Sequence, residues 1–177
     1  MKKLGFVAVM LMVGVTVAFA SSVSVPWFID TTPPQTAMNP DNNQWSGFVY
    51  LKNNSSEDTL CWISYNQQDG RFIGPYIEKG EQTTFVIPAN STMLFRPGVS
   101  DPIDQLRGQE GLDTGMLVPN RPRDTVADPL NDGKGNGSLT IRFEGGPTTV
   151  QGELHQIFKP NGAAQLVMSQ YLLPPGG

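Results

Sequence analysis

The residues best suited to bind a metal ion lie in a segment rich in glycine and aspartate. The run Asp132-Gly133-Lys134-Gly135-Asn136-Gly137 is similar to the start of a calcium loop, where oxygen ligands alternate and a glycine turns the chain. Lysine replaces one ligand, however, and a phenylalanine stands where a bidentate glutamate belongs. We therefore expect a solvated loop and no cofactor, with calcium as the one alternative. Its candidate ligands are Asp128, Asp132 and Asn136.

The residues that could act as a nucleophile and its base are few. Cys61 and His155 are the only cysteine and the only histidine, so a Cys–His pair is conceivable but a His/Cys zinc cluster within one chain is not. Both lie in strand-like runs without a supporting motif, and Cys61 is expected to be a small buried apolar residue. Carboxylates are plentiful, yet no spacing singles out the pair that a glycoside hydrolase needs. We therefore expect a non-catalytic protein, with a carboxylate hydrolase as the third hypothesis.

Aromatic side chains offer a different chemistry, because a flat apolar ring with polar edges can stack on a sugar. Trp45 follows a polar stretch and Tyr76 follows Gly-Pro, so these two are the candidate ligand-binding residues at the surface. Trp62 is instead expected to pack in the core. A carbohydrate-binding module is therefore the second function hypothesis, with a glycan as its ligand.

The charge balance argues against polyanionic partners. The chain has 12 Lys and Arg against 16 Asp and Glu, a formal charge of −4, and it contains no run of basic residues. Removing residues 1–20 takes away two lysines, so −4 becomes −6. We therefore expect no binding to nucleic acid or to an anionic membrane by charge.

The N-terminus has the three parts of a bacterial export signal. Met1-Lys2-Lys3 is basic, Leu4–Ala20 is uncharged and largely apolar, and Ala18-Phe19-Ala20 provides the small residues that a signal peptidase accepts. We expect cleavage before Ser21 and a mature protein without a transmembrane segment, in the periplasm, at the cell surface or in the extracellular space. With one cysteine, its stability must come from the core and not from an internal disulfide.

Short β-rich runs separated by turn residues dominate the rest of the chain. The 19 glycines and 15 prolines suit such an arrangement, and no long segment has helical periodicity. The pattern predicts an all-β fold, a single β-sandwich or barrel-like sandwich of seven to eight short antiparallel strands, with a long loop rich in Gly, Pro and Asp at 99–137. The expected strands are Phe48–Leu51, Thr59–Tyr65, Arg71–Ile73, Thr83–Ile87, Thr92–Arg96, Ser138–Glu144, Thr148–Phe158 and Ala164–Leu173.

The segment 21–45 reads as an apolar strand on a polar tether, in front of a sandwich domain at 46–177. Its apolar residues fall at every second position, at Val23, Val25, Trp27 and Ile29. Two interpretations stay open. The strand either forms an edge of the protein's own sheet, where Pro26 is tolerated, or completes the sheet of a neighbouring subunit as an interaction strand. Edge strands are the commoner case, and the first interpretation is preferred.

Between Phe48 and Ile103 the order of features resembles the small β-sandwich of the sensory-rhodopsin transducer family. The resemblance rests on Asn53 with Glu57-Asp58, the Ile63–Tyr65 run, Gly74-Pro75-Tyr76, Pro88-Ala89 and Asp101-Pro102. It covers about a third of the chain and departs from the family in the longer segment 77–87 and in the export signal. It implies a sandwich and a tendency to form oligomers through sheet edges, and no functional residue is carried over.

These observations favour an exported, non-catalytic β-sandwich with a structural or interaction role in the cell envelope or outside the cell. The expected partner is a second copy of the chain, in a self-assembling protein, or another envelope or extracellular protein.

Overall fold

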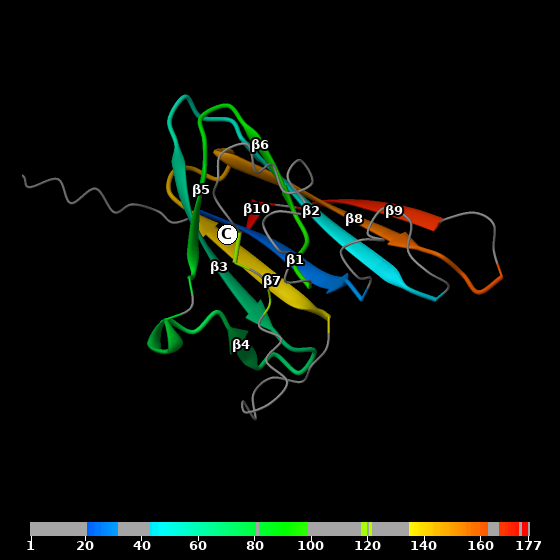
Figure 1. The fold of residues 1–177 in the computed structure, drawn as a ribbon. Coiled ribbons are helices and arrows are strands. Elements are labelled where there is room, and N and C mark those ends of the chain that lie inside the picture. The colour runs from blue at the N-terminus through cyan, green and yellow to red at the C-terminus, as the bar shows by residue number, and fades with distance from the viewer. Residues whose placement is uncertain are drawn as a thin grey trace, which may run out of the picture.

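The computed structural model describes residues 21–31, 43–80, 82–98, 118–119, 121, 135–162, 167–173 and 175–176. Two antiparallel sheets pack face to face in this part of the chain (Figure 1). The predicted signal peptide at 1–20 and most of the predicted loop at 99–137 lie outside the described residues. No helix within the described ranges is long and apolar enough to cross a membrane.

The first sheet, sheet A, has β7 and β3 at its centre. Its strand order is β10-β1-β7-β3-β4, and β5 also pairs with β3. Strand β5 lies against the first half of β3 and β4 against its last residues, so the two share one side of that strand. The bounds of the strands are Ser21–Ile29 (β1), Thr59–Asn66 (β3), Phe72–Gly74 (β4), Thr84–Ile87 (β5), Asn136–Phe143 (β7) and Pro175–Gly176 (β10).

The second sheet, sheet B, has four strands in the order β6-β2-β8-β9. Strands β2 and β8 are paired over nine consecutive residues, from Trp45 with Phe158 to Asn53 with Val150. A short 3-10 helix, η2 (Ile77–Lys79), lies between β4 and β5 in the sequence. The bounds are Trp45–Asn53 (β2), Thr92–Phe95 (β6), Val150–Phe158 (β8) and Val167–Leu173 (β9).

The predicted all-β sandwich is confirmed. Every strand expected from the β-rich runs is present, with ends that differ by a few residues, and the described residues add the two-residue strand β10. The largest change is in β2, which begins at Trp45 because Trp45, Ser46 and Gly47 also pair with the long strand β8.

The core between the sheets follows the two-residue period of the strands. On β7, Leu139, Ile141 and Phe143 are buried, while Thr140 and Arg142 on the other face are more accessible. The same alternation puts Val49 and Leu51 of β2 into the core. Burial of apolar surface stabilises a fold by about 25 cal/mol per Å². This cluster is therefore the main favourable term in folding, as expected for a chain without an internal disulfide.

Strand β1 belongs to the chain's own sheet, in line with the first interpretation of this segment. It pairs with β7 along most of its length, and Val23 and Val25 are fully buried in the core. The expected alternation fails after Pro26, because the pairing shifts register between Val25 and Phe28. Phe28 consequently faces the core, while Trp27 and Ile29 are only partly buried.

The expectation that Trp62 packs in the core is wrong. Its neighbours Cys61 and Ile63 occupy the core face of β3, so Trp62 points to the outer face and is 36% exposed. There it pairs with Arg142 of β7 and Thr84 of β5. The cysteine thus takes the buried position and the much larger indole does not.

Asn53 at the end of β2 connects several loops. Its fully buried side-chain amide donates hydrogen bonds to the carbonyl oxygens of Glu57, Ile87 and Pro88, at 2.8, 3.0 and 3.2 Å. The amide oxygen accepts a bond from the backbone N–H of Ser55 at 2.9 Å. One side chain thereby satisfies backbone groups from the β2–β3 turn and from the end of β5.

We predict that Asn53→Ala lowers the free energy of unfolding by about 2–3 kcal/mol, because it leaves buried carbonyl groups without their donor. Asn54→Ala is the matched control, since the Asn54 amide makes one exposed bond to the Thr148 carbonyl. Urea denaturation of both variants measures the difference. Equal losses in the two variants would contradict the role given to Asn53.

Candidate functional site

The most accessible apolar residues of sheet B lie on its edge strand β9. This strand pairs with β8 along one side, from Gly152 opposite Leu173 to Phe158 opposite Val167. Its other side has no strand partner among the described residues. We call this side the β9 edge. Leu172 is 81% exposed and Met168 is 65% exposed, and two further residues on the strand, Val167 and Tyr171, are each about half exposed.

Both faces of β9 are apolar. Met168 lies opposite Ile157 and Leu172 opposite Glu153, on the outer face of sheet B. Tyr171 lies opposite the buried residue Leu154, on the face turned toward sheet A. The strand sequence Val-Met-Ser-Gln-Tyr-Leu-Leu contains no charged residue, no proline and no glycine.

A small polar cluster lies beside β9 on the outer face of sheet B. The Tyr50 and His155 rings have centroids 4.5 Å apart, and His155 Nε2 lies 3.2 Å from a Glu153 carboxylate oxygen. The amide of Gln170 on β9 donates a hydrogen bond to the same carboxylate. Burial and, secondarily, the Glu153 carboxylate raise the pKa of the Tyr50 hydroxyl, so it stays protonated and can donate a hydrogen bond.

A shallow depression of about 230 Å³ opens next to this cluster. Its lining combines the Tyr50 ring and the Leu172 side chain with the polar residues Lys52, Gln151 and Glu153. The depression can therefore offer both an apolar surface and hydrogen-bonding groups to a small polar ligand.

The two aromatic residues predicted to bind a ligand lie outside this depression, and each packs against a neighbouring ring. The Trp45 ring stacks on Phe158 of the neighbouring strand, with centroids 4.4 Å apart and planes 18° apart. Tyr76 is buried, packs edge-on against Phe72, and directs its hydroxyl to the Phe72 carbonyl at 3.4 Å. A neighbouring ring thus covers one face of Trp45, and the Tyr76 ring is buried.

The calcium candidates fall mostly outside the described residues. Asp128 and Asp132 are not described, and Asn136 is the first residue of β7, where it pairs with Ile29. Within the described ranges, no three His, Cys, Asp or Glu side chains come together in a way that could hold a metal ion. Calcium binding stays a prediction.

Cys61 and His155 are positioned on different sheets. Cys61 is buried in the core on β3, where burial and the nearby Glu144 carboxylate raise the pKa of its thiol to about 12. His155 lies on β8 opposite Phe48, on the outer face of sheet B. A thiol with that pKa is almost entirely protonated at neutral pH and is a poor nucleophile.

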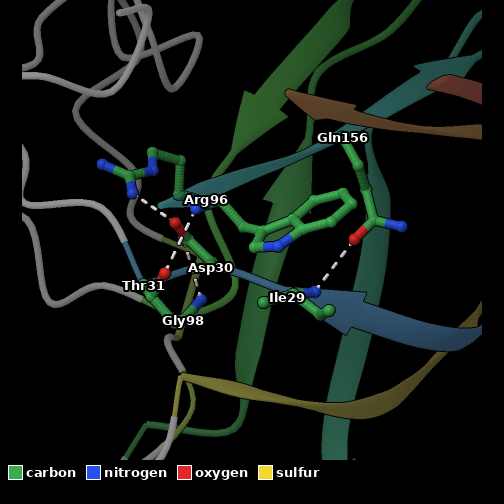
Figure 2. Close-up of polar contacts among 7 residues, drawn as sticks. Ile29, Asp30, Thr31, Arg96, Gly98 and Gln156 are labelled. Carbon is green, nitrogen blue, oxygen red and sulfur yellow. Dashed lines mark hydrogen bonds and ion pairs between the residues drawn. The ribbon is translucent and has the colours of Figure 1, made fainter. Parts of the chain in front are cut away.

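A buried ion pair joins the residue after β1 to the residue after β6. The Arg96 guanidinium contacts the Asp30 carboxylate, and both side chains are fully buried (Figure 2). The carboxylate also accepts a hydrogen bond from the Gly98 backbone at 3.3 Å. Next to it, the Ile29 N–H at the end of β1 donates to the Gln156 side chain at 3.0 Å, which ties β1 to sheet B.

Gly98 is what allows the chain to approach Asp30 so closely. A Cβ atom at position 98 would lie 2.7 Å from the Asp30 Cβ and 2.7 Å from the Gly135 carbonyl oxygen. The Asp30 N–H donates to that same carbonyl at 2.8 Å. The segments around Asp30, Gly98 and Gly135 therefore lie close together, and a side chain at position 98 would displace at least one of them.

Burial dominates the electrostatics of this carboxylate. It raises the pKa of Asp30 from 3.8 to about 6, although Arg96 and the backbone N–H groups of Gly98 and Gly47 oppose the shift. Removing a carboxylate from water costs more than the surrounding hydrogen bonds return.

No family model and no curated protein matches this chain. One solved structure, "Crystal Structure of Thermotoga maritima 1070", from Thermotoga maritima, is similar with a TM-score of 0.44 and 10% sequence identity, over 87% of this chain and 92% of that chain.

Sequence reasoning missed both the ion pair and the β9 edge. Asp30 and Arg96 are 66 residues apart and each lies at the end of a strand, where charged residues are normally solvated. The β9 edge does have a sequence signal: the chain contains no charged residue after Lys159. That neutral tail contains β9 and β10, and strands β1, β3, β4, β5 and β6 lack charged residues as well.

We predict that Asp30→Asn changes how stability depends on pH. Because the folded-state pKa is raised, protonation of Asp30 stabilises the fold; this contribution is complete below pH 3.8 and is lost as the pH rises through about 6. An asparagine cannot ionise. The stability of Asp30→Asn relative to the native protein should therefore improve between pH 4 and pH 7, as measured by urea denaturation at each pH. A change in the opposite direction would mean that Arg96 dominates the carboxylate and that its pKa is lowered.

Proposed function

We propose that this protein is an exported, non-catalytic β-sandwich that acts in the cell envelope or outside the cell by binding another polypeptide along the β9 edge. The observation that carries the proposal is the seven-residue edge strand with exposed apolar side chains on both faces. The export signal predicted at 1–20 supports the location, and the neutral tail after Lys159 supports the choice of surface.

Edge strands that must stay unpaired usually carry devices that prevent pairing. Lysine, proline, bulges and very short strands are the common ones, because an exposed edge presents backbone N–H and C=O groups to any other strand. Strand β1 has Pro26, and β4, β5 and β6 are only three to four residues long. Strand β9 has none of these devices, which is the property expected of an edge that is paired when the protein functions.

Site-specific photo-crosslinking in the cells that produce the protein tests this function. A photoreactive amino acid at Leu172 should give covalent adducts with a partner polypeptide. The matched control is the same amino acid at Ile77 on η2, which is 74% exposed and remote from β9 in the sequence. Adducts from position 172 should exceed those from position 77 at least several-fold. No adduct from position 172 would overturn the proposed function.

Carbohydrate binding is the second candidate function, and the depression beside Tyr50 is the observation that favours it. A pyranose needs an apolar face to lie on and hydrogen-bonding groups around its edge. Tyr50 and Leu172 supply the first, and Lys52, Gln151 and Glu153 supply the second.

A glycan array followed by calorimetric titration tests this candidate. We expect a bound glycan to lose affinity at least tenfold in Tyr50→Ala and to keep it in Phe72→Ala, in which an exposed aromatic residue of sheet A is removed. Equal affinity in both variants, or no binding by the native protein, would count against carbohydrate recognition at this surface.

A further inference from the structure

The charges on and around β9 indicate which class of polypeptide can bind at the β9 edge. The chain carries 12 basic and 16 acidic residues, so two copies have net charges of the same sign. The 18 residues from Pro160 to Gly177 carry no charged side chain. Where two identical strands pair antiparallel about a twofold axis, the residue on the axis faces its own copy, so a charge there would be repelled, and a strand without charges can pair with itself free of such repulsion.

The geometry of antiparallel pairing then restricts the register. If the twofold axis is perpendicular to the sheet, the outer face of β9 is the outer face in both copies. Two residues that lie opposite each other in an antiparallel pair point to the same face, so an outer-face residue can pair only with an outer-face residue. Residues of β9 therefore pair with residues of the same parity. In the register that pairs the whole strand, Gln170 at its centre lies opposite its own copy.

In this register most side chains of β9 lie opposite side chains of similar polarity. Met168 lies opposite Leu172 of the second copy on the outer face, and Ser169 lies opposite Tyr171 on the inner face. Val167 lies opposite Leu173. The two Gln170 side chains meet at the axis, and an amide can both donate to and accept from its own copy. The pairs that result are apolar with apolar or polar with polar, except for Ser169 with Tyr171, where the serine is small.

We propose that the partner of the β9 edge is a second copy of this chain, whose β9 pairs antiparallel with the first around a twofold axis at Gln170 and joins the two four-stranded sheets into one of eight strands. The inference rests on the proposed function and adds the identity of the partner and the register. A different protein would be under no constraint to leave the strand neutral, since opposite charges on its own strand could pair with charges on β9.

Disulfide trapping of the mature protein, residues 21–177, tests the register. The native background is clean, because Cys61 is buried with a thiol pKa of about 12. Gln170→Cys should form a disulfide-linked dimer under mild oxidation, since the Cβ atoms of directly opposite residues lie about 4.5–5.5 Å apart. Ser169→Cys is the control on the same strand, because its copies would be diagonal neighbours. Thr92→Cys is the control on β6, at the opposite edge of sheet B.

The expected result is a dimer from Gln170→Cys at least about tenfold faster than from Ser169→Cys or Thr92→Cys. Faster crosslinking of Ser169→Cys would overturn the register, and faster crosslinking of Thr92→Cys would move the interface to β6.

Light scattering over a concentration series tests the partner without any cysteine. The native mature protein should pass from monomer to dimer as its concentration rises. Leu172→Lys should raise the dissociation constant at least about tenfold, because it removes the apolar contact of Leu172 in both copies and adds a positive charge to each. Ile77→Lys adds the same charge elsewhere and should leave dimerisation unchanged.

The outcomes separate this inference from the proposed function. A native protein that stays monomeric at every concentration, while position 172 crosslinks in cells to a different polypeptide, overturns the second copy as partner and leaves the proposed function in place. A monomer that also gives no adduct in cells overturns both.

Discussion

The buried pair of Asp30 and Arg96 is the constraint on which this end of the sandwich depends. Asp30 follows the last residue of β1 in sheet A, and Arg96 follows the last residue of β6 in sheet B, so the pair joins the two layers. Gly98 can lie this close to Asp30 because it has no Cβ atom, and the Gly135 carbonyl accepts the Asp30 N–H on the same side. Breaking such a pair by removing one partner typically costs about 3–5 kcal/mol, because the other charge is then buried alone.

Burial of the Asp30 carboxylate also determines how much the ion pair can contribute to stability. Its raised pKa means that the fold tolerates the charge instead of profiting from it. An apolar pair of similar volume often serves equally well in such positions, so the presence of the ion pair is not by itself a sign of added stability. Arg96 additionally lies 5.8 Å from the Phe48 ring centroid, which links the pair to the small apolar cluster of Phe48 and Ile157.

Local sequence patterns predicted the strands well, because each strand is a β-rich run bounded by turn residues. They failed where tertiary contacts decide the outcome. Nothing local distinguishes Trp62 from Tyr65 as the core residue; their faces are set by the pairing of Cys61 with Phe143 and Phe85. Trp27 would have continued the alternation of Val23 and Val25, but the register shift at Pro26 gave its place to Phe28. The surface sites were the hardest to predict, since Tyr50, Glu153 and Gln170 meet only when three strands are aligned.

The position of β1 has a consequence for the order in which the chain can fold. Its pairing partners are β7 and, at Ser22 and Val23, the strand β10 at Pro175–Gly176. The first strand to be synthesised therefore has no partner until nearly the whole chain exists, and such long-range pairing is slow to form. Sheet A therefore cannot enclose Val23 and Val25 until the chain has been synthesised at least as far as β7.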